Sequence, residues 1–253
     1  MTELEKFYDV LARLESGELR VAQPSDGGWQ VNTWVKEVIL SGFRLGALTD
    51  MSQGQFSFFD KNTVPPRKFS ASDGVRIVPG GSSVRRGAYL APSVIVMPPA
   101  YVNIGAYVDE GSMVDSHVTI GSCAQIGKRV HVSAATQIGG VLEPVGALPT
   151  IVEDDCFVGG NCGIYEGTIL KKGCVVASGV IITGSTPIFD ATTGGFIRPV
   201  DGRMVVPEGA VVVSGSRSFE KGAAAGVQLY CPVIVKYRDA KTSASVALGD
   251  YLR

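Results

Sequence analysis

Residues 78–138 have the sequence VPGGSSVRRGAYLAPSVIVMPPAYVNIGAYVDEGSMVDSHVTIGSCAQIGKRVHVSAATQI, in which an aliphatic residue stands at every sixth position. A small or β-branched residue follows four positions after each of these residues except the last. A period of six fits neither a helix of 3.6 residues per turn nor the alternation of a strand. It is typical of a hexapeptide solenoid, a parallel β-helix with short flat faces. The aliphatic positions are Val78, Val84, Leu90, Val96, Val102, Val108, Val114, Ile120, Ile126, Val132 and Ile138.

The six-residue series stops at Ile138 and resumes two residues out of phase, beyond the prolines at 144 and 149. Because three hexads form one triangular coil, residues eighteen apart should stack at about 4.8 Å, the spacing of strands. We therefore expect a mainly β fold, a left-handed parallel β-helix, since known helices of this class are an exception to the usual handedness. The second series consists of Val152, Val158, Ile164, Leu170, Val176 and Ile182.

Outside the repeat, the chain divides into terminal segments that should cover the ends of the solenoid. Residues 1–75 are predicted to form an N-terminal helical domain, with helices after Thr2 and over 34–43, and an irregular linker from residue 50. The β-helix should cover 76–216, with an excursion near 187–205 and a last pair of hexads at Val206 and Val212. Residues 217–253 should form a C-terminal cap, with a strand over 228–236 and a helix over 243–252.

Composition excludes several functional classes. The net charge of −1 and the isoelectric point near 6.1 argue against a nucleic-acid binder, which needs a basic stripe. No apolar stretch reaches the roughly 18 residues of a membrane span, and the charged N-terminus is unlike a signal peptide. We therefore expect a cytoplasmic protein without membrane or nucleic-acid partners.

Three of the five cysteines, Cys156, Cys162 and Cys174, occupy the small-residue position of their hexads. A reduced cysteine behaves there as a compact apolar side chain. In the cytoplasm these side chains should remain thiols, so the sequence predicts neither disulfides nor a metal site.

Hexapeptide β-helices are associated with acyl transfer from coenzyme A, which is an argument from fold alone. Acylation of an amine needs a base, and the residue types leave three candidates, His117, His131 and Asp115. Asp115 directly follows the inward Val114, so its side chain should leave the core.

Several longer motifs indicate a function more specifically than the fold or the single candidate residues do. The chain carries YVNIGAYVDEGSMVD at 101–115, GSCAQIGK at 121–128, GGVLEP at 139–144 and YCPVIVK at 230–236, with FDK at 59–61 and GVRIVP at 74–79. This set resembles the tetrahydrodipicolinate N-succinyltransferase family over most of the chain.

The resemblance implies transfer of a succinyl group from succinyl-CoA to the amino group of ring-opened tetrahydrodipicolinate, in the diaminopimelate route to lysine. The fold association predicts a homotrimer with sites between neighbouring subunits, and the positions of the cysteines argue against a metal. Arg76 matches the arginine that holds a substrate carboxylate, and Asp115 matches the carboxylate that binds or deprotonates the amine. A direct transfer is expected, because no serine or cysteine has an obvious activating neighbour.

One position departs from the family pattern. Members carry a second glutamate where this chain has Gly163, three residues before Glu166. Either Glu166 or Glu143 replaces that carboxylate, as a catalytic or a substrate-binding residue, or the second carboxylate is dispensable.

Coenzyme A should lie along the outer wall towards the C-terminal coils. Its phosphates would meet Arg217 or Lys236, with Lys221 and Arg238 as further cations, and its pantetheine arm would meet Ser214 or Ser216. Ordinary solvated side chains remain an alternative explanation for each of them.

Other functions remain open at this point. An N-acetyltransferase acting on the same substrate, or an acyltransferase of an amino sugar, would share the fold. A zinc carbonic anhydrase on this β-helix needs three histidine ligands, and the chain has two histidines. A purely structural solenoid would leave the Asp115 motif unexplained.

Overall fold

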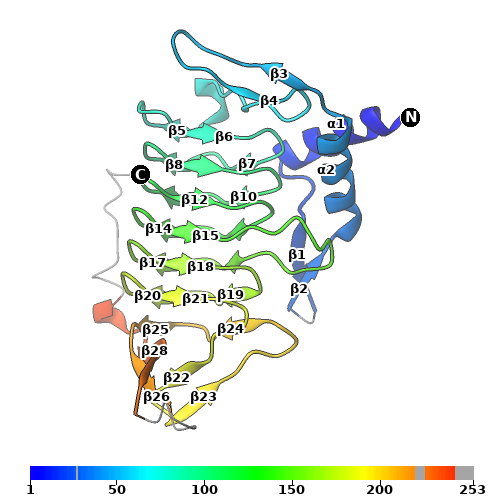
Figure 1. Cartoon of the computed structure of the whole chain (residues 1–253). Helices are drawn as coiled ribbons and strands as arrows, with labels where there is room; N and C mark the ends of the chain where they lie inside the picture. The colour runs from blue at the N-terminus through cyan, green and yellow to red at the C-terminus, as the bar shows by residue number, and fades with distance from the viewer. Residues whose placement is uncertain (27, 220–225, 243–253) are drawn as a thin grey trace.

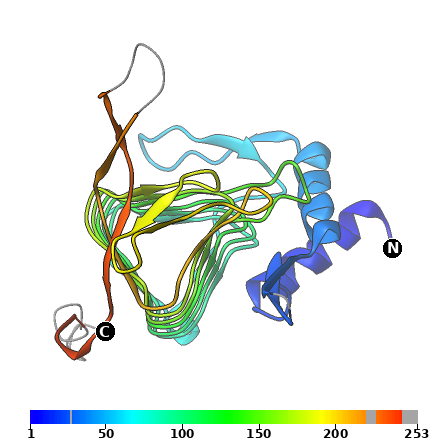
Figure 2. The same ribbon diagram turned by 90° about the horizontal axis from the view of Figure 1, so that it is seen from below.

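The computed structural model describes residues 1–26, 28–219 and 226–242. Its body is a stack of coils in which three parallel sheets enclose a triangular prism, as Figure 2 shows along the coil axis. Figure 1 shows the same coils from the side, with the two N-terminal helices along one flank. The predicted hexapeptide β-helix is confirmed.

We number the three sheets in the order in which the chain visits them. The coil strands of face 1 are β5 (Arg76–Ile77), β8 (Ile95–Val96), β11 (Met113–Val114), β14 (His131–Val132), β17 (Phe157–Val158), β20 (Val175–Val176) and β25 (Ala210–Val213). Face 2 contains β6 (Ser83–Val84), β9 (Tyr101–Val102), β12 (Thr119–Ile120), β15 (Gln137–Ile138), β18 (Gly163–Ile164) and β21 (Ile181–Ile182). Face 3 contains β7 (Tyr89–Leu90), β10 (Tyr107–Val108), β13 (Gln125–Ile126), β16 (Ile151–Val152), β19 (Thr168–Leu170) and β24 (Met204–Val206).

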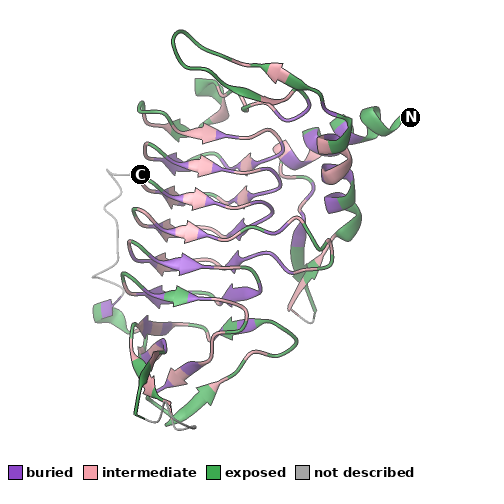
Figure 3. Ribbon diagram, viewed as in Figure 1, coloured by how far each residue is buried: buried purple, intermediate pink, exposed green. Residues whose placement is uncertain are grey.

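The aliphatic positions form the core of the prism. Val114 pairs in register with Val96 and with Val132, eighteen residues away on either side, and all three are fully buried. Buried aliphatic side chains contribute about 1.5–3 kcal/mol each. Figure 3 shows this burial continuing from coil to coil. Across the break in the series, Ile126 pairs with Val152, so one coil has eight extra residues in a loop.

The first position of the series was predicted wrongly. Ile77, and not Val78, pairs with Val96, and Val78 is only partly buried. The turn between β5 and β6 contains one residue more than the others. Gly80 and Gly81 accommodate it at φ of 142° and 94°.

The N-terminal segment packs on the solenoid through two helices, α1 (Glu3–Glu15) and α2 (Thr33–Leu45). The predicted capping box is present. The backbone N–H of Thr2 donates to the side chain of Glu5, and the backbone N–H of Glu5 donates to the side chain of Thr2. Phe7 and Ile39 of these helices form a buried cluster with Ile104 of the solenoid.

Two short antiparallel hairpins interrupt the predicted helical and linker regions. They are β1 (Ala22–Ser25) with β2 (Gly28–Val31), and β3 (Leu48–Asp50) with β4 (Phe59–Lys61), followed by the 3-10 turn η1 (Ala71–Asp73). Strands of three or four residues are too short for their alternation to stand out in the sequence.

The C-terminal end of the stack is covered by antiparallel strands. The excursion forms a hairpin of β22 (Ile188–Asp190) and β23 (Gly195–Ile197), and β26 (Ser216–Ser218) pairs with β27 (Gln228–Tyr230). The predicted strand over 228–236 is divided at Cys231-Pro232, and its second half, β28 (Val233–Tyr237), pairs with β25 and β22. The predicted closing helix over 243–252 lies outside the described residues.

Tyr230 closes one exposed edge. Its hydroxyl accepts a hydrogen bond of 2.7 Å from the backbone N–H of Ile181, in the last strand of face 2. In earlier coils the same N–H bonds to the next coil, as Gly163 does to Val180. The phenol therefore replaces the carbonyl of a missing coil.

All five cysteines are buried and free, and for Cys156, Cys162 and Cys174 burial was predicted from their place in the hexads. In the described part of the chain, no helix is both long and apolar enough to span a membrane.

The corner between faces 1 and 2 forces a left-handed backbone on successive coils. His117, Ala135 and Asn161 have φ of 61°, 59° and 57° there, and Gly179 has φ of 77°. Left-handed backbone costs a residue with a Cβ roughly 1–2 kcal/mol, whereas glycine adopts it freely.

We predict that Ala135→Gly raises the free energy of unfolding by up to about 1 kcal/mol, because relief of strain exceeds the added chain entropy. Denaturant unfolding monitored by circular dichroism measures this change.

Gly179→Ala is the matched control, since it occupies the same corner and a Cβ there would meet nothing within 4 Å. It should lower stability by about 1 kcal/mol through backbone strain alone. A change of stability in the same direction in the two variants would contradict backbone strain at this corner.

Candidate functional site

Asp115 lies on the outside of face 1, directly after β11. Its side chain is 28% exposed, and its Oδ1 accepts a hydrogen bond of 2.7 Å from the backbone N–H of Ser116. The predicted outward orientation is therefore observed, and it follows from the burial of the preceding Val114. One carboxylate oxygen is held by the backbone, and the other faces the next coil.

His131 is the neighbour of Asp115 on that coil. Its Nε2 is 3.6 Å from Oδ2 of Asp115, and its imidazole is only 16% exposed. The ring meets Phe157 edge-on, with 5.1 Å between ring centroids. The other histidine, His117, lies exposed at the corner between faces 1 and 2. The structure thus brings together two of the three candidate bases, a carboxylate and an imidazole.

A column of small residues continues from Asp115 towards the C-terminal coils. Ser133, Gly159 and Ala177 each follow the inward residue of the next strand of face 1. A Cβ on Gly159 would lie 2.6 Å from the backbone nitrogen of Ser178, so this position must stay a glycine. This column therefore carries no large side chain along three coils, and it lies next to the rings of His131 and Phe157.

Arg76 lies on the same face as Asp115. Its strand, β5, is two strands before β11, which is about 10 Å along the coil axis. Arg76 is exposed. An arginine at that separation suits a substrate that presents a carboxylate to it and an amine to Asp115.

Glu143 and Glu166 lie elsewhere, near the corner between faces 2 and 3. Both are exposed, and Glu166 lines a cavity of about 220 Å³ with Leu148 and Arg203. Glu143 belongs to the extra loop, which α2 holds through a hydrogen bond of 2.7 Å from the buried Nζ of Lys36 to Ala147. Within one chain, the structure does not bring either glutamate to Asp115.

Gly163 has no room for a side chain. A Cβ there would lie 2.6 Å from the ring of Tyr165 and 2.9 Å from Ile181. The ring of Tyr165 therefore occupies the space that a longer side chain at position 163 would need.

The residues predicted to bind coenzyme A gather at the C-terminal end. Lys236 pairs in register with Val211 on face 1, five strands beyond β11, and its Nζ is 3.0 Å from Asp239. Ser214 donates to the carbonyl of Gly179 at 3.3 Å. Ser216 and Arg217 belong to β26, and Lys221 lies outside the described residues.

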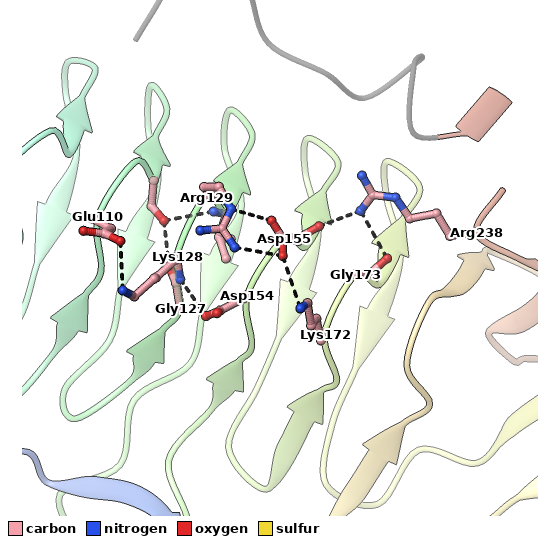
Figure 4. Close-up of polar contacts among 11 residues, drawn as sticks. Glu110, Gly127, Lys128, Arg129, Asp154, Asp155, Lys172, Gly173 and Arg238 are labelled. Atoms are coloured by element: carbon pink, nitrogen blue, oxygen red, sulfur yellow. Dashed lines mark hydrogen bonds and ion pairs between the residues drawn. The ribbon is translucent and has the colours of Figure 1, made fainter. Parts of the chain in front are cut away.

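Arg238 has a structural contact that the sequence did not reveal. Figure 4 shows its guanidinium at the corner between faces 3 and 1, where Nη1 donates to the carbonyl oxygens of Asp155 at 2.6 Å and Gly173 at 3.4 Å. Nη1 thus faces the backbone of two coils, and the binding of a phosphate by this guanidinium stays a prediction.

Ion pairs along the same corner tie successive coils together. Lys128 bonds Glu110 at 2.8 Å, and Arg129 bonds Asp155 through two contacts of 2.7 and 3.0 Å. The hydrogen bond from Arg129 holds the pKa of Asp155 below its ordinary value. Each of these charges has an opposite partner, and the ion pairs support the corner.

The buried thiols are unsuited to nucleophilic attack. Burial raises the pKa of Cys123 to about 12 and also raises the pKa of Cys156, which is next to Cys174. Both side chains therefore stay protonated at neutral pH. Among the residues that the structure describes, no group of three or more His, Cys, Asp or Glu could hold a metal ion.

Two family models match the chain. One, described as Tetrahydrodipicolinate N-succinyltransferase N-terminal, matches residues 2–45. The other, described as Hexapeptide repeat of succinyl-transferase, matches residues 149–184.

Curated relatives match the chain along its length. A 2,3,4,5-tetrahydropyridine-2,6-dicarboxylate N-succinyltransferase from Sodalis glossinidius is 47% identical, over 100% of this chain and 90% of the relative. One from Neisseria meningitidis is also 47% identical, over 98% of this chain and 89% of the relative. A solved structure described as a 2,3,4,5-tetrahydropyridine-2-carboxylate N-succinyltransferase from Campylobacter jejuni is 17% identical with a TM-score of 0.45, over 91% of this chain and 62% of that one.

Proposed function

The chain belongs to the tetrahydrodipicolinate N-succinyltransferase family, acyltransferases of the diaminopimelate route to lysine, and from this membership we propose how its residues carry out the reaction. The donor is succinyl-CoA, and the acceptor is the amino group of ring-opened tetrahydrodipicolinate. The names of the relatives, which are succinyltransferases, support this choice over an acetyl donor. We also propose a cytoplasmic location, which suits five free thiols.

Asp115 is the group that receives the proton of the amine. Its Oδ2 is not held by the backbone and lies on the outer wall, where a substrate amine has access. The amine nitrogen attacks the thioester carbon, and the carbonyl oxygen takes the electron pair. As the oxyanion collapses, the C–S bond breaks, the amide remains, and the proton held by Asp115 passes to the departing thiolate.

Arg76 binds a carboxylate of the acceptor. It shares face 1 with Asp115 at about 10 Å along the axis, a separation that an extended seven-carbon dicarboxylate and the arginine side chain bridge together. The guanidinium offers two parallel donors to a carboxylate, which fixes the orientation of the amine towards Asp115.

Coenzyme A lies along the small-residue column, from Asp115 to the C-terminal strands. Lys236, five strands away on the same face, and Arg217 meet its phosphates, and Ser214 and Ser216 meet its pantetheine arm. The absence of large side chains at Ser133, Gly159 and Ala177 supports this path.

The active form is a homotrimer with sites between subunits. Asp115 and Glu166 lie at different corners of the prism, so a site that contains both must be built from two chains. Glu166, or Glu143 from the neighbouring loop, then supplies the second carboxylate from the adjacent subunit.

The choice of donor is tested by thiol release. With tetrahydrodipicolinate present, the protein should release free coenzyme A from succinyl-CoA with a kcat/KM at least about tenfold above that for acetyl-CoA. A spectrophotometric thiol assay with both thioesters, and without acceptor as a blank, measures it. A preference for acetyl-CoA would show that the donor is wrong.

Asp115→Asn keeps the shape of the side chain but removes the base, so kcat should fall by about 100-fold or more. Steady-state kinetics and an unfolding curve of the same preparation check this. Asp109→Asn is the matched control, because Asp109 follows an inward valine of face 3 and its Oδ1 also accepts from the next backbone N–H, at 2.8 Å. Asp115 has no part in the chemistry if both variants keep normal turnover.

Mixing two inactive variants tests the shared site. Asp115→Asn and Glu166→Gln should each be inactive alone, yet recover about a quarter of wild-type activity when co-refolded in equal amounts. In equal amounts, three quarters of randomly assembled trimers contain both variants. In each of these trimers, one site of the three receives a native Asp115 from one chain and a native Glu166 from its neighbour. The mass of the assembly comes from light scattering.

Glu143→Gln, mixed in the same way, separates the two candidate glutamates. If Glu166→Gln is fully active alone, and a mixture of Asp115→Asn with Glu143→Gln recovers activity, the second carboxylate is Glu143 of the extra loop. An active monomer would contradict the shared site.

A further inference from the structure

Ser133 has a buried hydroxyl that the fold leaves unsatisfied. Its Oγ is shielded from solvent and has no hydrogen-bond partner within residues 1–26, 28–219 and 226–242. Buried hydroxyls at another position of the hexad do have partners. Ser112 donates to the carbonyl of Gly127 at 2.7 Å, and Thr136 donates to that of Gly159 at 2.9 Å.

The unsatisfied hydroxyl lies next to Asp115. Both residues directly follow inward valines, Val114 and Val132, which pair in register on adjacent strands. Their backbones are therefore about 4.8 Å apart on the outer wall of face 1. The next residue in this column, Gly159, carries no side chain, so no side chain from that position covers the hydroxyl.

Folding alone does not explain this serine. Leaving a buried hydroxyl without a partner costs about 1–3 kcal/mol, and an alanine in its place would avoid the cost. Ala177, two strands further along the same column, shows that the position accepts alanine. A buried polar group that weakens the fold and borders a reactive carboxylate indicates a role in function.

We infer that Ser133 is a catalytic residue, whose hydroxyl donates a hydrogen bond to the thioester carbonyl oxygen as that oxygen becomes negatively charged. This inference rests on the proposed acyl transfer. In the tetrahedral intermediate, the amine nitrogen and the oxyanion are bonded to the same carbon. An acceptor and a donor on adjacent strands are placed to meet one each, Asp115 the nitrogen and Ser133 the oxygen.

The energetics agree with this assignment. A donor aimed at developing charge stabilises the transition state more than the bound substrate, and it acts best where water is excluded. The hydroxyl is already shielded from solvent before the substrate arrives, so it does not have to lose water during the reaction.

Ser133→Ala should lower kcat by about 100-fold while KM for the thioester changes by less than about threefold. The loss of kcat should be the same with succinyl-CoA and acetyl-CoA, because both thioesters carry a carbonyl oxygen on the reacting carbon. The inference is therefore tested even if the donor proves to be acetyl. The melting temperature should stay the same or rise, because the variant removes an unsatisfied hydroxyl.

Thr168→Val is the matched control. Thr168 is fully buried on face 3, and its Oγ1 likewise has no partner in the described chain. This variant should also keep or raise the melting temperature, with kcat unchanged. Unchanged kcat in Ser133→Ala, or equal losses in the two variants, would overturn the inference.

The pH profile separates an oxyanion donor from a residue that acts through Asp115. An oxyanion donor lowers kcat equally at every pH, and the midpoint of the profile stays in place. If Ser133→Ala instead moves the midpoint, the hydroxyl serves to position or polarise Asp115, and the inference is wrong. Asp115→Asn, measured in parallel, reports on the proposed base independently of Ser133.

Discussion

The hydrogen bonding of each coil to the next is the constraint on which the rest of the molecule depends. Because residues eighteen apart are paired, a side chain's neighbours lie one coil away and not beside it in the sequence. Burial of Val114 and Val132 then forces Asp115 and Ser133 outward on adjacent strands. The same register places the imidazole of His131 beside the carboxylate of Asp115. The prism core thereby decides which polar groups meet.

The parts of the structure that repeat were predictable from the sequence. The six-residue period identifies the inward positions, and the capping box marks the start of α1, because each depends on local chemistry. The outward position of Asp115 followed from the same period. The series failed at Val78, where one extra residue in a glycine turn shifts the register. Periodicity locates a residue only while every turn has the same length.

The contacts between coils could not be predicted in the same way. The contact of Arg238 with the carbonyls of Asp155 and Gly173 joins segments more than sixty residues apart, and backbone carbonyls have no sequence signal. The unsatisfied Ser133 resembles any serine in a hexad until its partners are known. Asp115 and His131 are sixteen residues apart in the sequence. This spacing indicates a contact only when the length of a coil, eighteen residues, is known.

The phenol of Tyr230 has a consequence for how the molecule behaves at high concentration. A parallel stack ends in a row of unpaired amides, and such a row is a template on which another chain can add a strand. By accepting the hydrogen bond of Ile181, the phenol withdraws one of these donors from any incoming backbone. On face 1, β28, β22 and β23 continue the sheet beyond β25, so the last coil strand of that face is already paired on both sides. The cap therefore opposes strand addition at the last coil as well as completing its core.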